Sequence, residues 1–420
     1  MRDEKERKTE YMKQKLRSEI EGIKNINDQK IYNQIDQIIL RESKEEYMTL
    51  DQRQEIRKNL FNAVRGLGLL QDLIDDDEIT EIMVNGTEAI FIEKAGEMKK
   101  WKYRFTSKSH LEDLIQQIAG RCNRIVNEAN PVADARLENG DRVSIVLPPA
   151  AVNGPILTIR RFPKHPISMG DLIAWNSITQ EAADFLKRLV EAGYNIFISG
   201  GTGSGKTTFL NALSDFIPKQ ERIITIEDNA ELQIQGVENL VRMEERKGHF
   251  LKEKDITIRD LIKASLRMRP NRIIVGEVRG EEAIDMLQAM NTGHDGSLST
   301  AHANNPRDMM MRLETMVLMG IELPISAIRR QIAGGIDIMV HLGRRRDHSR
   351  KVLEIVEITG YDCEKEEIQT QILYEYEEMS KINMGGLIKK GNLKNIDKWQ
   401  RYSQRKMGER KQNGEEVLPI

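Results

Sequence analysis

The sequence predicts an α/β protein in which an N-terminal helical region and a smaller α+β domain precede a doubly wound, largely parallel sheet. Three observations lead to this fold class. Apolar residues recur at helical spacing in residues 1–66, alternating strand-like stretches fill residues 70–162, and apolar strands alternate with helices in residues 171–400. The 420 residues are enough for two or three domains of ordinary size.

The N-terminal region, residues 1–66, is polar and charged, with three stripes of apolar side chains at residues 12–23, 31–39 and 56–64. Such stripes are typical of amphipathic helices, so we expect three short helices here. Two roles fit the pattern: a solvated appendage or a docking module for a partner protein.

The second region, residues 70–162, contains Asn85-Gly86 between two alternating stretches, which is a strong signal for a β-hairpin turn. We therefore expect an antiparallel sheet with a short helix. Residues 163–170 contain two prolines and a glycine, which favours a linker between domains. Residues 401–420 are basic, and we expect a disordered tail there, with binding to an acidic membrane surface or partner as the alternative.

Composition limits the classes of function. Lys plus Arg total 64 and Asp plus Glu total 66, so the net charge of −2 argues against a general electrostatic nucleic-acid binder. Cys122 and Cys363 cannot form a disulfide framework and lack metal-ligand spacing. No apolar run approaches the roughly 18 residues of a membrane span, and the N-terminus lacks the apolar stretch of a signal peptide. We expect a cytosolic protein that reaches any membrane through a partner.

A phosphate-binding loop is the strongest motif. Residues 200–207 fit the pattern G-x-x-x-x-G-K-[ST] between an apolar strand at 196–199 and an apolar helix, which is the context the motif requires. Lys206 would neutralise the β and γ phosphates of a nucleotide, and Thr207 would bind Mg²⁺. A glycine-rich turn without phosphate is the alternative. The expected nucleotide-binding residues are Gly200, Gly201, Thr202, Gly203, Ser204, Gly205, Lys206, Thr207 and Thr208.

Two acidic residues end later strands of the same predicted sheet. Glu227 follows the strand at 223–226, and Glu277 follows the strand at 273–275. Because ligands of parallel sheets lie outside the carboxyl ends of the strands, both glutamates are candidates for the active site. His302 lies among small and hydroxyl residues, a setting that favours a sensor of the γ-phosphate over a purely structural histidine. The wide spacing of His294 and His302, with no cysteine or third histidine nearby, argues against a zinc site.

The order of four segments resembles a known family. GGTGSGKTT, IEDNAEL, RPNRIIVGEVRGEEA and NTGHDGSLSTAHANNPRD follow one another as in the ATPases of type II and type IV secretion systems. Within that superfamily the sequence is most similar to the CpaF-like branch, the motors of tight-adherence pilus assembly. ITEIMVNG, DARLENGDRV and GPILTIRRF, which precede the phosphate loop, have the same resemblance, and it spans about residues 70–400.

This resemblance implies a RecA-like ATPase domain and a ring-shaped homohexamer that holds ATP and Mg²⁺ between domains and adjacent subunits. It places Glu277 with Thr207 on the metal side, Glu227 in an acidic box and His302 in a histidine box.

The resemblance also implies that arginines ahead of the linker, Arg142, Arg160 and Arg161, bring positive charge to the phosphates. A salt bridge away from any phosphate is the alternative for each. Arg160 and Arg161 are neighbours on a strand and face opposite ways, so we expect only one of them to reach the nucleotide.

The expected function is that of a cytoplasmic ATPase motor that drives pilus assembly or secretion through polytopic inner-membrane platform proteins. A DNA-transfer translocase and an effector-secretion ATPase are alternatives, although the net charge leads us to expect no contact with nucleic acid. A nucleotide switch without catalysis is disfavoured because Glu227, Glu277 and His302 together form a water-activating set. Pilus retraction remains open within the motor class.

Overall fold

The computed structural model describes residues 11–12, 15–16, 18–19, 28–45, 47–64, 66–94, 96–105, 107–162, 166–246, 255–378 and 385–412. The chain forms two compact units that divide between Lys164 and His165. None of the helices in these described ranges has both the length and the apolar character that a membrane span needs.

Two helices of the first unit, α2 (Asp28–Glu45) and α3 (Leu50–Val64), cover the second and third predicted stripes. Their apolar faces pack together, and Ile35 and Leu60 are fully buried in this cluster. Only part of the first stripe is described. It is helical at residues 11–12, 15–16 and 18–19, and Met12 and Leu16 are buried in the same cluster.

The rest of the first unit is an antiparallel sheet of six strands in the order β3-β2-β1-β6-β5-β4. The predicted turn Asn85-Gly86 joins the first two strands, and Gly86 adopts the left-handed conformation that the turn requires, with φ of 58°. The elements are η1 (Gly68–Leu70), α4 (Gln71–Asp75), β1 (Ile79–Asn85), β2 (Ala89–Lys94), β3 (Glu97–Lys100), α5 (Lys108–Arg121), β4 (Val132–Arg136), β5 (Arg142–Val146) and β6 (Ile156–Arg160).

The second unit contains a nine-stranded sheet in the order β15-β14-β13-β12-β7-β11-β10-β8-β9. The six strands from β12 to β9 are parallel to their neighbours, and the three beyond β12 are antiparallel. The strands are β7 (Ile196–Gly200), β8 (Ile223–Glu227), β9 (Leu240–Glu244), β10 (Arg272–Val275), β11 (Leu298–Ala301), β12 (Ile338–Arg344), β13 (Arg350–Asp362), β14 (Glu367–Glu377) and β15 (Gly386–Lys389).

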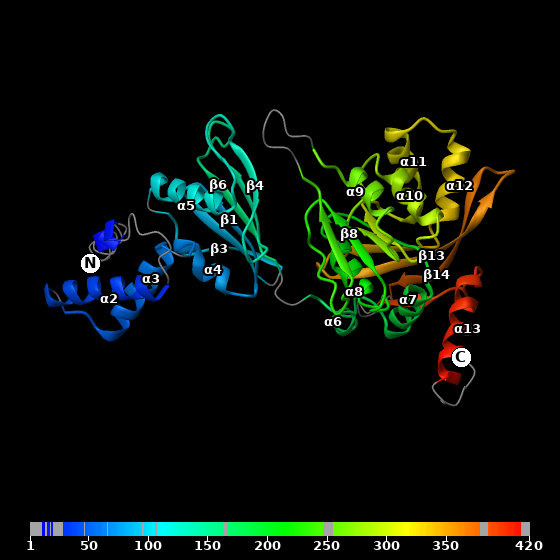
Figure 1. The fold of residues 1–420 in the computed structure, drawn as a ribbon, viewed down its shortest axis with the longest axis horizontal. Coiled ribbons are helices and arrows are strands. Elements are labelled where there is room, and N and C mark those ends of the chain that lie inside the picture. The colour runs from blue at the N-terminus through cyan, green and yellow to red at the C-terminus, as the bar shows by residue number, and fades with distance from the viewer. Residues whose placement is uncertain are drawn as a thin grey trace. The chain divides into compact units, whose positions relative to one another are not determined.

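Helices cover both faces of this sheet (Figure 1). Alternate residues of the central strand β7 enter different cores: Ile196 and Ile198 pack with α6, α7 and α8, whereas Phe197 packs with α9 to α12. This arrangement confirms the doubly wound α/β architecture. The helices are α6 (Met169–Ala174), α7 (Gln180–Ala192), α8 (Lys206–Ser214), α9 (Ile258–Ser265), α10 (Ala283–Asn291), α11 (Pro306–Gly320), α12 (Ile325–Gly335) and α13 (Asp397–Gln412).

Two predicted boundaries differ from the structure. Helix α6 begins inside the predicted linker 163–170, because Ser168 and Asp171 form a reciprocal capping box at its start. The predicted disordered tail, residues 401–420, is helical up to Gln412 as part of α13. Trp399 packs against the core, and the Tyr402 hydroxyl donates a hydrogen bond of 2.5 Å to Glu191 on α7. Residues 413–420 lie outside the described part of the chain.

Candidate active site

The glycine-rich loop of the second unit has a backbone conformation that residues other than glycine rarely adopt. Gly203 and Gly205 have φ of 71° and 91°, in the left-handed region. A Cβ on Gly200 would lie 2.5 Å from Ser204 Oγ and 2.6 Å from the carbonyl oxygen of Leu342. The loop therefore turns tightly from the end of β7 into the N-terminus of α8, which is the arrangement that directs backbone N–H groups toward a phosphate.

Lys206 is the buried cation of this loop. Its side chain folds back, so that Nζ donates to the carbonyls of Gly200 and Gly201 at 3.1 and 3.2 Å. Burial is the main cause that lowers the pKa of Lys206, and the nearby carboxylate of Glu277 opposes it. Carbonyl oxygens are weaker acceptors than phosphate oxygens, so the ammonium fits a triphosphate better than its present partners.

His302 connects Lys206 with Glu277. Its Nδ1 lies 3.1 Å from Lys206 Nζ, and its Nε2 lies 3.0 Å from Glu277 Oε1. Because an ammonium can only donate, Nδ1 is the acceptor in its contact with Lys206. Nε2 is close to Glu277 Oε1 without a hydrogen bond, since that oxygen has no hydrogen-bond partner among the described residues. Burial, helped by Lys206 and other cations, lowers the pKa of His302 against the opposing effect of Glu277. The imidazole is therefore neutral at pH 7, and the three predicted residues form one connected chain.

Arg279 extends this chain on the other side of Glu277. Its Nη2 donates to Glu277 Oε2 at 2.8 Å, and its Nη1 lies 2.9 Å from Asp228 Oδ2. The hydrogen bond to Glu277 is the main cause that raises the pKa of Arg279. Sequence reasoning missed this arginine, although it stands two residues after the strand-terminal glutamate.

Glu227 lies at the carboxyl end of β8 but does not join the chain formed by Lys206, His302 and Glu277. Its Oε2 accepts hydrogen bonds from the backbone N–H groups of Glu231 and Leu232, at 2.7 and 2.9 Å. The other oxygen, Oε1, is buried without a hydrogen-bond partner among the described residues. Burial raises the pKa of Glu227 to about 7. A carboxyl group that titrates near neutral pH is a candidate for proton transfer.

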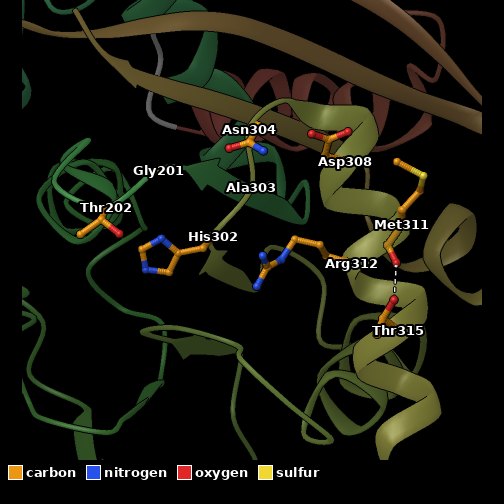
Figure 2. A pocket seen from close by; sticks show the side chains of 9 residues that line it. All are labelled: Gly201, Thr202, His302, Ala303, Asn304, Asp308, Met311, Arg312 and Thr315. Atoms are coloured by element: carbon orange, nitrogen blue, oxygen red, sulfur yellow. Dashed lines mark hydrogen bonds between the residues drawn. The ribbon is translucent and has the colours of Figure 1, made fainter.

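A pocket of about 430 Å³ opens beside the loop (Figure 2). Thr202 and His302 line it from one side, and Arg312 of α11 lies opposite. Thr207 and Thr208 follow Lys206 in the first turn of α8. Within the described ranges, no group of three His, Cys, Asp or Glu residues could hold a metal ion by itself.

The predicted arginines belong to the first unit and have different environments. Arg142 and Arg160 are paired across β5 and β6, and Arg136 is paired with Arg142 across β4 and β5. One face of the sheet therefore carries a row of three arginines. Arg136 was not predicted, although it lies in the DARLENGDRV segment.

Arg161 is held within the first unit by its own contacts, which corresponds to the salt-bridge alternative given above for each of these arginines. Its Nε lies 3.1 Å from a carboxylate oxygen of Asp141, and its Nη1 donates to the carbonyls of Leu73 and Asp76. Only 7% of its side chain is exposed, against 62% for Arg160. The strand alternation explains the contrast, since neighbours on a strand face opposite sides.

The fold and this site together define the class of protein: a P-loop ATPase of the RecA-like type. Residues 63–414 match the family described as Type II/IV secretion system protein. The chain belongs to this family and is an ATP-hydrolysing enzyme of the type II/IV secretion-system class.

Individual relatives agree with this assignment. The type IV secretion system protein PtlH of Bordetella pertussis is 33% identical over 322 residues, which cover 69% of this chain and 93% of PtlH. The conjugal transfer protein TrbB of Rhizobium radiobacter is 33% identical over 292 residues, 69% of this chain and 86% of TrbB. The pilus retraction motor PilT with bound ADP has the same fold, with a TM-score of 0.52 at 18% identity over 82% of this chain and 89% of PilT.

Proposed function

We propose that this chain is the ATPase motor of a tight-adherence (CpaF-like) pilus-assembly system and acts as a homohexamer on the cytoplasmic side of the inner membrane. The observation that carries the proposal is the chain Lys206–His302–Glu277, which joins the phosphate loop to the strand end where a catalytic carboxylate belongs. The order of the four sequence motifs supports the assignment to the pilus branch.

Each residue of the site has a role in this proposal. The loop amides and Lys206 hold the β and γ phosphates, while Thr207 and Glu277 hold Mg²⁺, which supplies positive charge when bound. Glu277 also orients the attacking water and accepts its proton. A triphosphate would compete with His302 for the ammonium of Lys206, so His302 reports the presence of the terminal phosphate to Glu277. Glu227 supports the site from the next strand by fixing the turn that follows it.

Arg142 and Arg160 deliver further positive charge in this proposal. Both belong to the unit that does not contain the phosphate loop, so they reach a nucleotide only when units or subunits close on it. An arginine that arrives by closure stabilises charge in the transition state and couples hydrolysis to motion. Membrane-embedded platform proteins convert that motion into movement of pilin subunits, and ATP itself never meets the cargo.

A second candidate function is transfer of DNA or effector proteins, which the similarity to the conjugal transfer protein TrbB favours. The motor would then act on the transfer apparatus rather than on nucleic acid, because a net charge of −2 offers no general electrostatic attraction to DNA.

The test is the variant Lys206→Ala, with Lys187→Ala as the matched control, because Lys187 is an exposed lysine on α7 of the same unit. Steady-state ATPase assays, nucleotide titration and circular dichroism are measured on both. We expect Lys206→Ala to lose ATP hydrolysis almost completely and to keep its fold, since Lys206 contributes charge to a loop rather than core packing. Hydrolysis at the parental rate in Lys206→Ala would contradict the proposed site.

A further inference from the structure

Arg312 lies on α11 and faces the phosphate loop across the 430 Å³ pocket. Its guanidinium extends from the helix toward the imidazole of His302, and Gly201 and Thr202 of the loop form the opposite wall (Figure 2). Since Lys206 of the same loop contacts His302, the pocket adjoins the place where the terminal phosphate of a bound triphosphate would lie.

The charge of Arg312 has no partner among the described residues. Neighbouring arginines differ in this respect. Arg279 is bound by Glu277 and Asp228, and Arg329 is bound by Glu314. The structure gives Arg312, whose side chain is exposed, neither a hydrogen bond nor an ion pair within the described residues. An uncompensated guanidinium that faces a phosphate loop is a site for an anion.

The lining of the pocket identifies the class of ligand. Its side chains are mainly polar, with Thr202, His302, Asn304, Asp308 and Thr315 among them, and the imidazole of His302 is the ring that the lining offers. A phosphoryl group with its attendant water has the oxygens that these donors require.

We infer that Arg312 is a further catalytic residue, which binds the terminal phosphoryl group of ATP from within the same subunit. This inference rests on the proposed function. In the reaction, a bond forms between the water oxygen and the γ-phosphorus, the bond from that phosphorus to the β–γ bridging oxygen breaks, and ADP keeps the electron pair. The water loses its proton to Glu277, and Arg312 makes only hydrogen bonds to the non-bridging oxygens, where negative charge lies in the transition state.

The test compares the affinity for ADP with the affinity for a non-hydrolysable ATP analogue in the full chain. Arg312→Gln removes the charge, Arg312→Lys keeps it, and Arg307→Gln is the control, since Arg307 is an exposed arginine of the same helix outside the pocket. We expect Arg312→Gln to weaken binding of the analogue roughly 10- to 100-fold, which is the loss expected for one charged hydrogen bond. The affinity for ADP should stay within about twofold of the parental value, because ADP lacks the terminal phosphate that Arg312 would contact. Arg312→Lys should recover part of the loss.

An equal loss of ADP and analogue affinity, or no loss of either, in Arg312→Gln would overturn the inference. If this variant fails to fold, the folded Arg312→Lys decides. Parental affinity for both ligands, or an equal loss of both, contradicts a contact between the guanidinium and the terminal phosphate, whereas a selective loss for the analogue supports it. Lys206→Ala separates this outcome from failure of the whole site. Unchanged binding of both nucleotides in Lys206→Ala would refute the nucleotide site itself, whereas weakened binding there with no change in Arg312→Gln would refute only the role of Arg312.

Discussion

Replacing Glu227 with glutamine should change the pH dependence of stability in the second unit. Burial raises the pKa of Glu227 from an ordinary value of 4.5 to about 7. The folded state therefore holds a proton that the unfolded state has released between these two values, and stability falls as the pH rises from about 4.5 to about 7. At 1.36 kcal/mol per pKa unit, the full difference is about 3 kcal/mol. The parent loses this contribution above pH 7, whereas Glu227→Gln never gains a charge.

Hydrogen exchange of the β8 and β10 amides, corrected for intrinsic rates, measures the free energy of opening in this unit at pH 5 and pH 8. The quantity of interest is the free energy of opening of the variant minus that of the parent. We expect this difference to be more favourable to the variant at pH 8 than at pH 5, by up to about 3 kcal/mol. A glutamine oxygen can still accept from the N–H groups of Glu231 and Leu232, so the turn is retained. Glu238→Gln, a change at an exposed glutamate, is the control. Identical pH dependence in parent and Glu227→Gln would refute the argument.

Three further predictions concern other parts of the chain. Asp141→Ala should lower the free energy of unfolding of the first unit by about 3–5 kcal/mol, because it leaves the buried guanidinium of Arg161 without its carboxylate; denaturant unfolding measures this, and a loss below about 1 kcal/mol would mean that the pair is not a buried ion pair. Glu277→Gln should bind ATP with Mg²⁺ yet hydrolyse it at least about 100-fold more slowly, as expected for loss of a general base; single-turnover assays check this, and the parental rate would move the catalytic role elsewhere. Arg160→Ala should reduce hydrolysis more than nucleotide binding, and the specific activity of the parent should rise with protein concentration in parallel with assembly seen by light scattering; full activity in a stable monomer would contradict an arginine that acts between subunits.

The phosphate loop was predictable from sequence because its geometry is local. Gly203 and Gly205 have left-handed backbone conformations, and Gly200 has no space for a side chain, so the motif itself fixes the shape. The meeting of Glu277 and His302 was predictable for a different reason. Both follow parallel strands, and the carboxyl ends of such strands share one edge of the sheet.

What the sequence did not predict depends on distant partners. Alternation along β6 separates Arg160 from Arg161, but only the position of Asp141, which lies 20 residues earlier, shows that Arg161 is the buried one. Arg279 and Arg312 acquire their places from the packing of loops and helices on the sheet, which no local pattern encodes. The helix at residues 397–412 has few apolar residues, and it is anchored by two aromatic side chains, Trp399 and Tyr402, among many charges.

The active site keeps two ionisable groups in environments that oppose their charges. Burial lowers the pKa of Lys206 and raises that of Glu227, and both lie at the edge formed by the carboxyl ends of the parallel strands. Such burial reduces the stability of the folded unit, so it persists only where the rigid sheet holds the groups in place. A triphosphate offers Lys206 a stronger acceptor than the two carbonyls and the imidazole that now share its hydrogens. Binding energy at this loop therefore comes partly from relief of an unfavourable charge. When Lys206 turns to the phosphate, it gives up its contact with His302. Among the described partners of Lys206, His302 is the side chain that also contacts Glu277. The same arrangement that weakens the unit without nucleotide thus provides a direct physical route from phosphate binding to the carboxylate of Glu277, which we propose as the catalytic one.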